Sequence, residues 1–561
     1  MPLCGKRIRA SQVFDSAVTK GIWRVQLSHG APVRFARFDD SCLVASAGLV
    51  PVMALAQRAG LVETAGALLT VPGSAGSAAG AKVASLVAGM VAGADSISDM
   101  GLLRHGAMSR LFAGARAPST LGTFLRAFRF GHVRQLDAVA ARVLAGLTEL
   151  SPMFAGADHE ITYLDVDDTV RATYGYAKQG AGYGYTGVKG LNALLATASI
   201  RGVSAAPVIV ATRLRKGSVH SARGAARLVA DAIKSTHRAG VTGMLVLRGD
   251  SAYYTREVIA AARRHSVAFS ITARKNTAVT AAIASIPEDA WTTIRYPRAV
   301  FDEQLQQWIS DAEVAEIPFT AFGSRGKKHA VTARLIVRRV RDANPEHVQV
   351  SAQGELFRVW RHHAVFTNSP LPMLDAEADH RRHAIIEQVI ADLKAGPLAH
   401  LPSGSFAANS AWLVLATIAY NLLRATGALA STIHARATTA TLRAQLINVA
   451  ARVVRSSRRT RLRLLHQLAL GRRLATAVHR RDRATHTGLT DPRRQRPTGD
   501  IQWNSRADRQ PTHARTPTHR TGDQLHSNHR DRGASTKGYS WNIDHCWAHR
   551  RLRSASCASA P

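Results

Sequence analysis

The sequence predicts a mixed α/β core that follows a helical block and precedes a basic C-terminal region. Three stretches carry this prediction: residues 161–171 read as a strand ending in acids, residues 244–247 form an apolar run followed by an acid, and residues 379–395 show helical spacing of apolar side chains. Strand and helix patterns that alternate in this way indicate a sheet covered by helices.

The N-terminal part predicts a basic segment, residues 1–40, and a helical domain, residues 41–155. We expect helices at 52–59, 79–94, 95–113 and 119–149. A basic block of this kind can bind DNA as a helix-turn-helix variant, and an ordinary helical domain with a solvated basic face is the alternative. The basic residues on the exposed side of the last helix are Arg126, Arg129, His132, Arg134 and Arg142.

Residues 156–275 predict the first part of the core, and its first strand carries the most informative acids. Asp165 and Asp167 face one side of the sheet and Asp168 faces the other, because successive strand side chains alternate. Paired acids at a strand end need a cation or a proton, and hard carboxylate ligands suit Mg²⁺ or Mn²⁺. A solvated strand end is the alternative. The further elements expected in this part are strands at 192–200, 207–212, 244–247 and 267–272, and helices at 221–238 and 254–264.

Two features of the same part point to a ligand. Asp250 follows a continuous apolar run, at the strand end where open α/β sheets bind ligands, although an acid there can also cap the next helix. Lys178 and Lys189, in the segment 174–190 rich in Gly and Tyr, are candidates for phosphate contact.

Period-two alternation predicts a β-rich insertion at residues 276–375. Trp291, Trp308 and Trp360 fall within it; we expect core positions for two of the three, while exposed rings would stack on unpaired bases.

The second part of the core, residues 376–430, begins with a helix over 379–395. His380, His383, Glu387 and Lys394 are spaced to lie along one ridge of this helix beside its apolar stripe. Such a ridge offers a carboxylate for a metal ion among groups that hold phosphate, and a surface charge ladder is the alternative.

Composition favours a polyanionic partner and excludes several classes of protein. The net charge is +36 over 561 residues and the pI is about 11.3, which is typical of nucleic-acid binding. The sequence has no apolar run long enough for a spanning helix, no signal peptide and no Walker A pattern, and Cys4, Cys42, Cys546 and Cys557 have no metal-ligand spacing. We therefore expect no membrane and a reducing cytoplasm.

The order of these elements brings Asp167, Asp250 and Glu387 to one edge of a mixed sheet, as in a ribonuclease H-like fold. Three carboxylates there can hold two metal ions that activate the attacking oxygen and stabilise the leaving oxygen of a phosphodiester. The predicted reaction is in-line substitution at phosphorus by water or a DNA 3′-hydroxyl.

Four phrases of the sequence resemble the DDE insertion-sequence transposases that carry an inserted β domain, most closely the IS thirteen-eighty family. The resemblance covers roughly residues 38–463. The phrases are Tyr163-Leu-Asp-Val-Asp-Asp-Thr-Val, Tyr174-Gly-Tyr-Ala-Lys-Gln-Gly, Arg248-Gly-Asp-Ser-Ala-Tyr-Tyr and Ile386-Glu-Gln-Val-Ile-Ala-Asp-Leu-Lys.

The resemblance implies that Asp167, Asp250 and Glu387 are the first, second and third catalytic and metal-binding acids, with Asp165 as the alternative for the first. It also implies two Mg²⁺ or Mn²⁺ ions, terminal inverted repeats and target DNA as partners, a homodimer on DNA, and a bacterial, nucleoid-associated location. Lys394 stands at the family's separation from the third acid, whereas His380 and His383 replace its Tyr and Arg. Phosphate contacts are expected from Lys394, His383, Arg382, Lys178 and Lys189.

The C-terminal part departs from that family. Residues 431–470 predict a basic helical region, and residues 471–561 a disordered tail, because eighteen Arg and Lys stand against seven Asp and Glu between positions 472 and 561. A shifted reading frame near the end of the gene would explain this composition, and a genuine basic DNA-binding tail is the alternative explanation. Three functions remain: an active transposase, a catalytically inactive DNA-binding remnant, and a nuclease of the same fold acting on RNA–DNA hybrids, which the helical block and the insertion argue against.

Overall fold

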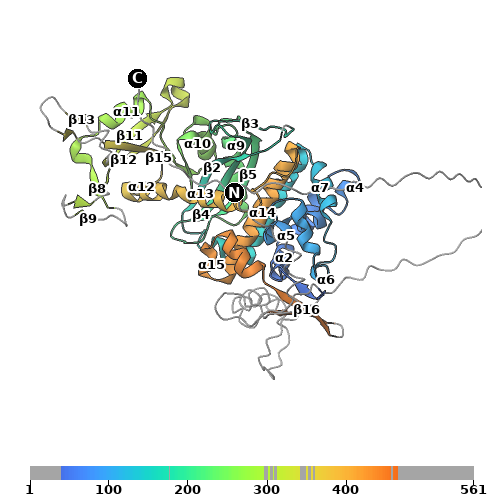
Figure 1. Cartoon of the computed structure of the whole chain (residues 1–561). Coiled ribbons are helices and arrows are strands. Elements are labelled where there is room, and N and C mark those ends of the chain that lie inside the picture. Colours follow the sequence, from blue (N-terminus) through green and yellow to red (C-terminus); the bar gives the residue numbers. More distant parts are fainter. Residues whose placement is uncertain are drawn as a thin grey trace, which may run out of the picture. The chain divides into compact units, whose positions relative to one another are not determined.

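The computed structural model describes residues 39–175, 177–295, 301–302, 307–308, 312–341, 349–350, 356–357, 360–456 and 459–464, all within one compact unit, Met1–Asn504. Predictions for residues 1–38 and for the tail after 464 lie outside the described residues. The fold is mixed α/β, as predicted: helices of the N-terminal part and of the C-terminal part pack against a large mixed sheet (Figure 1).

The N-terminal part is helical, and α5 and α8 are its longest helices. Residues 95–113, expected as one helix, contain a 3-10 helix and a short α-helix instead, because Gly106 adopts φ +54° between them. The expected helix over 119–149 is two helices, since Arg129 is extended and its amide donates to the His132 ring, which starts a new helix. The elements are α2 (Leu49–Arg58), α3 (Leu61–Leu68), α4 (Gly73–Gly76), α5 (Ala79–Ala92), η1 (Ser98–Arg104), α6 (Met108–Leu111), α7 (Pro118–Arg126), α8 (Phe130–Leu150) and η2 (Pro152–Phe154).

A ten-stranded sheet forms the centre, in the order β3-β4-β2-β6-β7-β15-β12-β11-β8, with β5 paired to β4. Strands β5, β4 and β2 are antiparallel, and β2, β6 and β7 are parallel. The elements of its first part are β2 (Thr162–Ala172), β3 (Gly182–Tyr183), β4 (Lys189–Ile200), β5 (Val208–Lys216), α9 (Ala225–Arg238), β6 (Leu245–Gly249), η3 (Ser251–Tyr253), α10 (Arg256–Arg264) and β7 (Ala268–Thr272).

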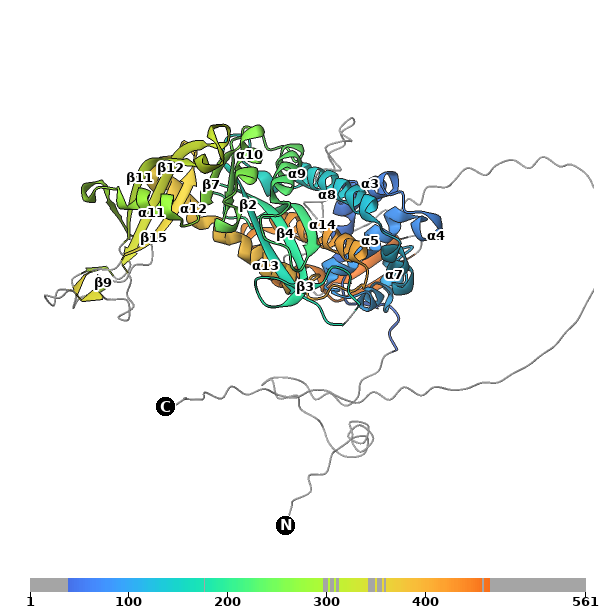
Figure 2. The same ribbon diagram turned by 90° about the horizontal axis from the view of Figure 1, so that it is seen from above.

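The strands expected from 276–375 continue this sheet beyond β7, with α12 alongside them (Figure 2). Trp291 and Trp360 both stack on the Arg339 guanidinium, whose Cζ lies 4.2 and 4.5 Å from the two ring centroids. These two rings therefore make cation–π contacts inside the protein. The side chain of Trp308 lies outside the described residues. The elements are α11 (Thr277–Ala284), η4 (Glu288–Ala290), β8 (Thr292–Ile294), β9 (Phe301–Asp302), β10 (Gln307–Trp308), β11 (Ala312–Ala321), η5 (Gly323–Arg325), η6 (Lys327–His329), β12 (Val331–Arg341), β13 (Gln349–Val350), β14 (Leu356–Phe357) and β15 (Trp360–Thr367).

Helix α14 (Phe406–Ala430) joins the N-terminal helices to the sheet, since it contacts α5, α8 and β5. The expectation that no apolar run is long enough for a spanning helix was wrong by length and composition, because this helix of the described residues meets both criteria. However, 89% of its most apolar window is buried within the protein, as in the core helix of a globular fold. Asn421 on this helix pairs with the edge strand β5, accepting from the Ile209 amide at 2.9 Å and donating to its carbonyl at 2.7 Å. The remaining helices are α12 (Met373–Arg381), η8 (Arg382–Ala384), α13 (Ile385–Lys394), α15 (Thr432–Arg436), α16 (Thr439–Leu442) and the π-helical turn η9 (Arg443–Ile447).

The region 431–470, expected to be helical, changes to strands after residue 447. β1 (Leu43–Val44), β16 (Ala451–Ser456) and β17 (Arg459–Leu464) form a separate three-stranded antiparallel sheet. The reason is local in β17: arginine alternates with Leu at period two over residues 461–464, a spacing that a strand separates onto two faces and a helix does not.

Candidate active site

The register between two parallel strands sets the position of the first two acids. On β2 and β6, Asp165 lies beside Arg248 and Val166 beside Gly249. Asp250 directly follows β6, whereas Asp167 lies within β2, which continues to Ala172 and does not end at the acids as expected. The register nevertheless places Asp167 and Asp250 next to each other. This is the edge at which α/β sheets of parallel strands place their ligands.

A cavity of about 280 Å³ opens at this edge, and Asp167, Asp250 and Glu387 all line it. Glu387 comes from the exposed side of the first turn of α13. The three predicted acids thus reach one cavity from β2, from the end of β6 and from α13. The other lining residues are Thr272, Arg338, His363, Ala364, Val365, Glu377, His380, Arg381, His383, Ala384 and Ile386.

Asp165, the alternative first acid, is fully buried and has a different partner. Its two carboxylate oxygens accept from Nε and Nη2 of Arg248 at 2.6 and 2.7 Å, and Nδ1 of His383 lies 3.3 Å away. Burial alone would raise the pKa of this carboxyl group, but Arg248 and His383 hold the pKa below its ordinary value. Asp165 is therefore an ionised group already neutralised inside the protein, and it does not line the cavity.

Asp168 faces the opposite side of β2, as the alternation predicts, and its carboxylate is also satisfied. It accepts from Arg215 at 2.8 Å, from the hydroxyl of Tyr253 at 3.0 Å, and from the side-chain amide of Asn192. Burial, followed by the charges of Asp168 and Asp167, raises the pKa of Tyr253, which therefore stays a neutral donor. Of the three acids on β2, only Asp167 lines the cavity.

Asp167 carries the electrostatic signature of a cation site. Burial raises its pKa to about 6; the Asp168 amide and His383 oppose this rise, and the charges of Asp250 and Asp168 add smaller contributions to it. A divalent ion would relieve this repulsion, so the donor set fits a hard metal ion. Within the described residues, no three His, Cys, Asp or Glu side chains are close enough together to hold a metal ion as they stand.

Asp250 also caps a helical turn, which was the alternative interpretation of this acid in the sequence. Its Oδ1 accepts from the Ala252 amide at 2.9 Å and so caps the 3-10 turn η3. Thr255, whose hydroxyl accepts from the Val258 amide, caps α10 instead. The cap leaves Asp250 lining the cavity while holding its backbone in place.

The predicted helix over 379–395 is interrupted where it meets the site. α12 ends at Arg381 and α13 begins at Ile385, with a 3-10 turn between them; here the Asp379 carbonyl accepts from Arg248. His380 is buried, with its ring nitrogens 3.0 Å from the hydroxyls of Ser270 and Thr272, and burial lowers its pKa to about 3. This imidazole is neutral and satisfied.

The five predicted phosphate contacts fall in different places. His383 lines the cavity, and Arg382 is exposed but pairs with Asp379 at 2.7 Å. Lys394 is half-buried in the last turn of α13 and does not line the cavity. Lys178 donates to the Leu401 carbonyl, and burial lowers its pKa; Lys189 begins β4 and also lies outside the cavity lining.

Sequence reasoning missed the wall opposite the acids. Arg338 on β12 and Arg381 on α12 both pair with Glu377, each at 2.9 Å, and His363 on β15 lies beside them in the cavity lining. The strand pattern located β12 and β15, but nothing in the sequence indicated that the sheet would carry them to this cavity.

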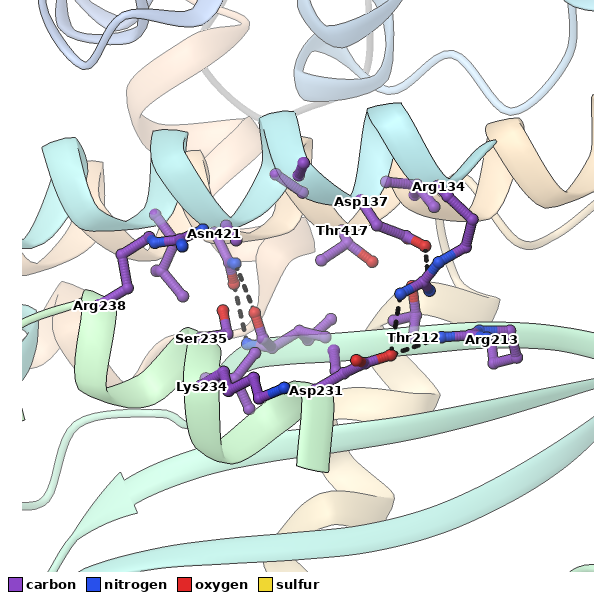
Figure 3. A pocket seen from close by; sticks show the side chains of 18 residues that line it. Arg134, Asp137, Thr212, Arg213, Asp231, Lys234, Ser235, Arg238, Thr417 and Asn421 are labelled. Carbon is purple, nitrogen blue, oxygen red and sulfur yellow. Dashed lines mark hydrogen bonds and ion pairs between the residues drawn. The ribbon is translucent and has the colours of Figure 1, made fainter. Parts of the chain in front are cut away.

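A second cavity, of about 200 Å³, lies between α8, β5, α9 and α14 (Figure 3). Asp231 binds both Arg134 at 3.1 Å and Arg213 at 2.8 Å, and Arg134 also binds Asp137 at 2.7 Å. Burial raises the pKa of Asp137 to about 6, although the two arginines oppose this. Arg134, expected on an exposed basic face, instead ties the helical block to the sheet.

Comparison with known proteins places the chain. A family model described as "Transposase DDE domain group 1" matches residues 26–485. No curated protein sequence matches the chain. One similar solved structure is the cryo-electron microscopy structure of the piggyBac transposase synaptic complex with hairpin DNA, at 10% sequence identity and a TM-score of 0.32, covering 71% of this chain and 80% of that one.

Proposed function

Because the chain belongs to the DDE transposase domain family, we propose that it is the DNA transposase of an insertion sequence and that Asp167, Asp250 and Glu387 are its catalytic acids. The observation that carries this proposal is the common cavity: three acids far apart in sequence line one space at the carboxyl edge of the sheet. The strand order β5-β4-β2-β6-β7, with three antiparallel strands followed by parallel ones, supports a ribonuclease H-like core.

The proposed reaction is cleavage of a phosphodiester at the end of the element, followed by transfer of the free 3′-hydroxyl to target DNA. The three carboxylates would hold Mg²⁺ or Mn²⁺, two ions in all. When bound, such ions lower the pKa of the attacking oxygen and stabilise the leaving one. The raised pKa of Asp167 supports this assignment, since a neighbouring cation would stabilise the charged form of this buried carboxyl group.

The residues around the acids have supporting roles in this proposal. The Asp165–Arg248 pair joins the strands that carry Asp167 and Asp250, and so fixes the spacing of these two acids. His383 and His363, which both line the cavity, are suited to donate to phosphate oxygens.

The finer expectations remain part of the proposal. The chain would bind terminal inverted repeats and target DNA as a homodimer, in the bacterial cytoplasm at the nucleoid, as a member of the IS thirteen-eighty family. The helical block would contribute to repeat recognition.

Cleavage of end-labelled duplexes that carry the element's ends tests the proposal. The full-length protein should nick them only with Mg²⁺ or Mn²⁺. Asp167→Asn, Asp250→Asn and Glu387→Gln should each lower the rate by about 10³ or more, which corresponds to about 4 kcal/mol of transition-state stabilisation, while duplex binding persists. Asp289→Asn, at an exposed acid outside the cavity, is the matched control and should nick normally.

Two results would reject parts of the proposal. Binding to the ends with no metal-dependent nicking by the unmodified chain would identify a catalytically inactive DNA-binding remnant. Cleavage of RNA–DNA hybrids in preference to element ends would identify a nuclease of the same fold.

A further inference from the structure

The hairpin of β16 and β17 is the most strongly basic part of the described fold that the proposed reaction does not use. Residues 451–464 contain six arginines and no acid. β16 pairs with β17 on one side and with the short strand β1 on the other. In Figure 1 the hairpin projects from the helices around α2 and α6.

The register divides this hairpin into two faces, because residues directly opposite each other share a face. Ala451 lies opposite Leu464 and Val453 opposite Leu462. Ala451 and Val453 are buried, and both leucines pack against the hydrophobic core. This face anchors the hairpin to the protein.

The other face is cationic. Arg452 lies opposite Arg463, and Val454 opposite Arg461. The Arg452 side chain is 61% exposed, and Arg463 is also exposed. Nearer the tip, Arg455 is exposed although the register puts it on the anchoring side, so the tip extends beyond the core.

Folding gains little from this arrangement. Like charges directly opposite each other destabilise a sheet. Asp40 lies 3.5 Å from Nε of Arg452, but an exposed ion pair of this kind contributes only about 0–1 kcal/mol. The opposed cations Arg452 and Arg463 weaken their own sheet, and a polyanion outside the protein would neutralise them.

We propose that the β16–β17 hairpin is a DNA-binding ribbon whose face with Arg452 and Arg463 contacts phosphates of duplex DNA. The major groove, about 12 Å wide, admits a two-stranded ribbon, whose strands lie about 4.8 Å apart. The choice of DNA as the polyanion rests on the proposed function, whereas the geometry of the hairpin does not depend on the catalytic acids. The helical block alone would then not account for DNA binding.

The test measures duplex affinity of the full-length protein as a function of salt. Each phosphate contact contributes about −0.9 to the slope of log K against log salt. Arg452→Gln/Arg463→Gln should therefore reduce the slope by about 1.8 and weaken binding about 60-fold at 0.1 M salt, equally for element ends and unrelated duplexes. Arg452→Lys/Arg463→Lys keeps the charges and should keep the slope.

A matched pair of charges on a different element controls for net charge. Arg263→Gln/Arg264→Gln, at exposed positions near the end of α10, removes the same charge and should leave the slope unchanged. An equal loss in this control would attribute binding to overall charge and overturn the inference. If the glutamine pair lowers the melting temperature, Arg463→Gln alone, at an exposed position of the cationic face, replaces it, with an expected slope change of about 0.9.

Two further readouts separate this inference from the proposed function. At saturating protein the hairpin variant should still nick with Mg²⁺, whereas Asp250→Asn should bind with the full slope and not nick. Unchanged duplex binding by the hairpin variant overturns the ribbon and leaves the catalytic proposal standing. The inference would also be overturned if the hairpin variant bound heparin or double-stranded RNA more weakly than the unmodified protein but bound duplex DNA equally well.

Discussion

Replacing Arg248 by methionine should strongly destabilise the fold at the sheet edge that carries Asp167 and Asp250. The guanidinium is 2% exposed and Asp165 is 0% exposed, and two hydrogen bonds of 2.6 and 2.7 Å join them. Arg248→Met leaves the Asp165 carboxylate buried with only His383 nearby, at 3.3 Å. Loss of one partner from a buried ion pair costs about 3–5 kcal/mol, and we expect a loss in this range.

Urea denaturation of the full-length protein at pH 7.5, followed by tryptophan fluorescence, measures this loss. The double variant Asp165→Asn/Arg248→Met removes both charges and should recover about half of it or more, because no uncompensated charge remains. Asp165→Asn alone should also destabilise, since it leaves the guanidinium buried.

The pH dependence has a defined sign. Asp165 has a folded-state pKa below its ordinary value, so the ion pair stabilises the fold above the unfolded-state pKa of about 4 and is lost as pH falls through the folded-state value. In Arg248→Met this carboxyl group takes up a proton more readily, so the difference from the unmodified protein should shrink in acid. A loss below about 1 kcal/mol at pH 7.5, or a difference that does not change with pH, would refute the reasoning.

Three further predictions concern other parts of the fold. Because the pKa of Asp167 is raised to about 6, protons compete with Mg²⁺ for this carboxylate. The apparent affinity for Mg²⁺, measured by calorimetry, should fall up to tenfold per pH unit below about pH 6. Asp167→Asn should abolish this pH dependence. Asn421→Ala strips both hydrogen bonds from the Ile209 backbone at the edge of β5 and should cost about 2–4 kcal/mol in urea denaturation; an effect below 1 kcal/mol would mean that water replaces the amide. Burial raises the pKa of Asp137 to about 6, so its charged form destabilises the fold above that pH. Asp137→Asn should therefore raise the free energy of unfolding at pH 8 by about 1–3 kcal/mol. Asp231→Asn removes the shared partner of two arginines and should instead lower the free energy of unfolding by about 1 kcal/mol.

The sequence by itself determined the family and the mixed α/β class. The four quoted phrases predicted a DDE transposase, which the family model confirms. Continuous apolar runs and period-two alternation predicted strands, because these patterns depend on the side chains of neighbouring residues and not on distant parts of the chain. The same local information nominated Asp167, Asp250 and Glu387.

The family resemblance favoured Asp167 and left Asp165 as the alternative, and the tertiary structure gives the physical difference between these two acids. Both lie on one face of β2, and nothing local separates them; the distinction comes from Arg248, which the parallel register of β6 brings beside Asp165. Arg134 shows the same dependence, since its position on α8 fits a solvent-facing cation until α9 and β5 bring Asp231 and Arg213 beside it. Ion pairing between distant elements is a property of the assembled fold, and for that reason no window of the sequence contains it.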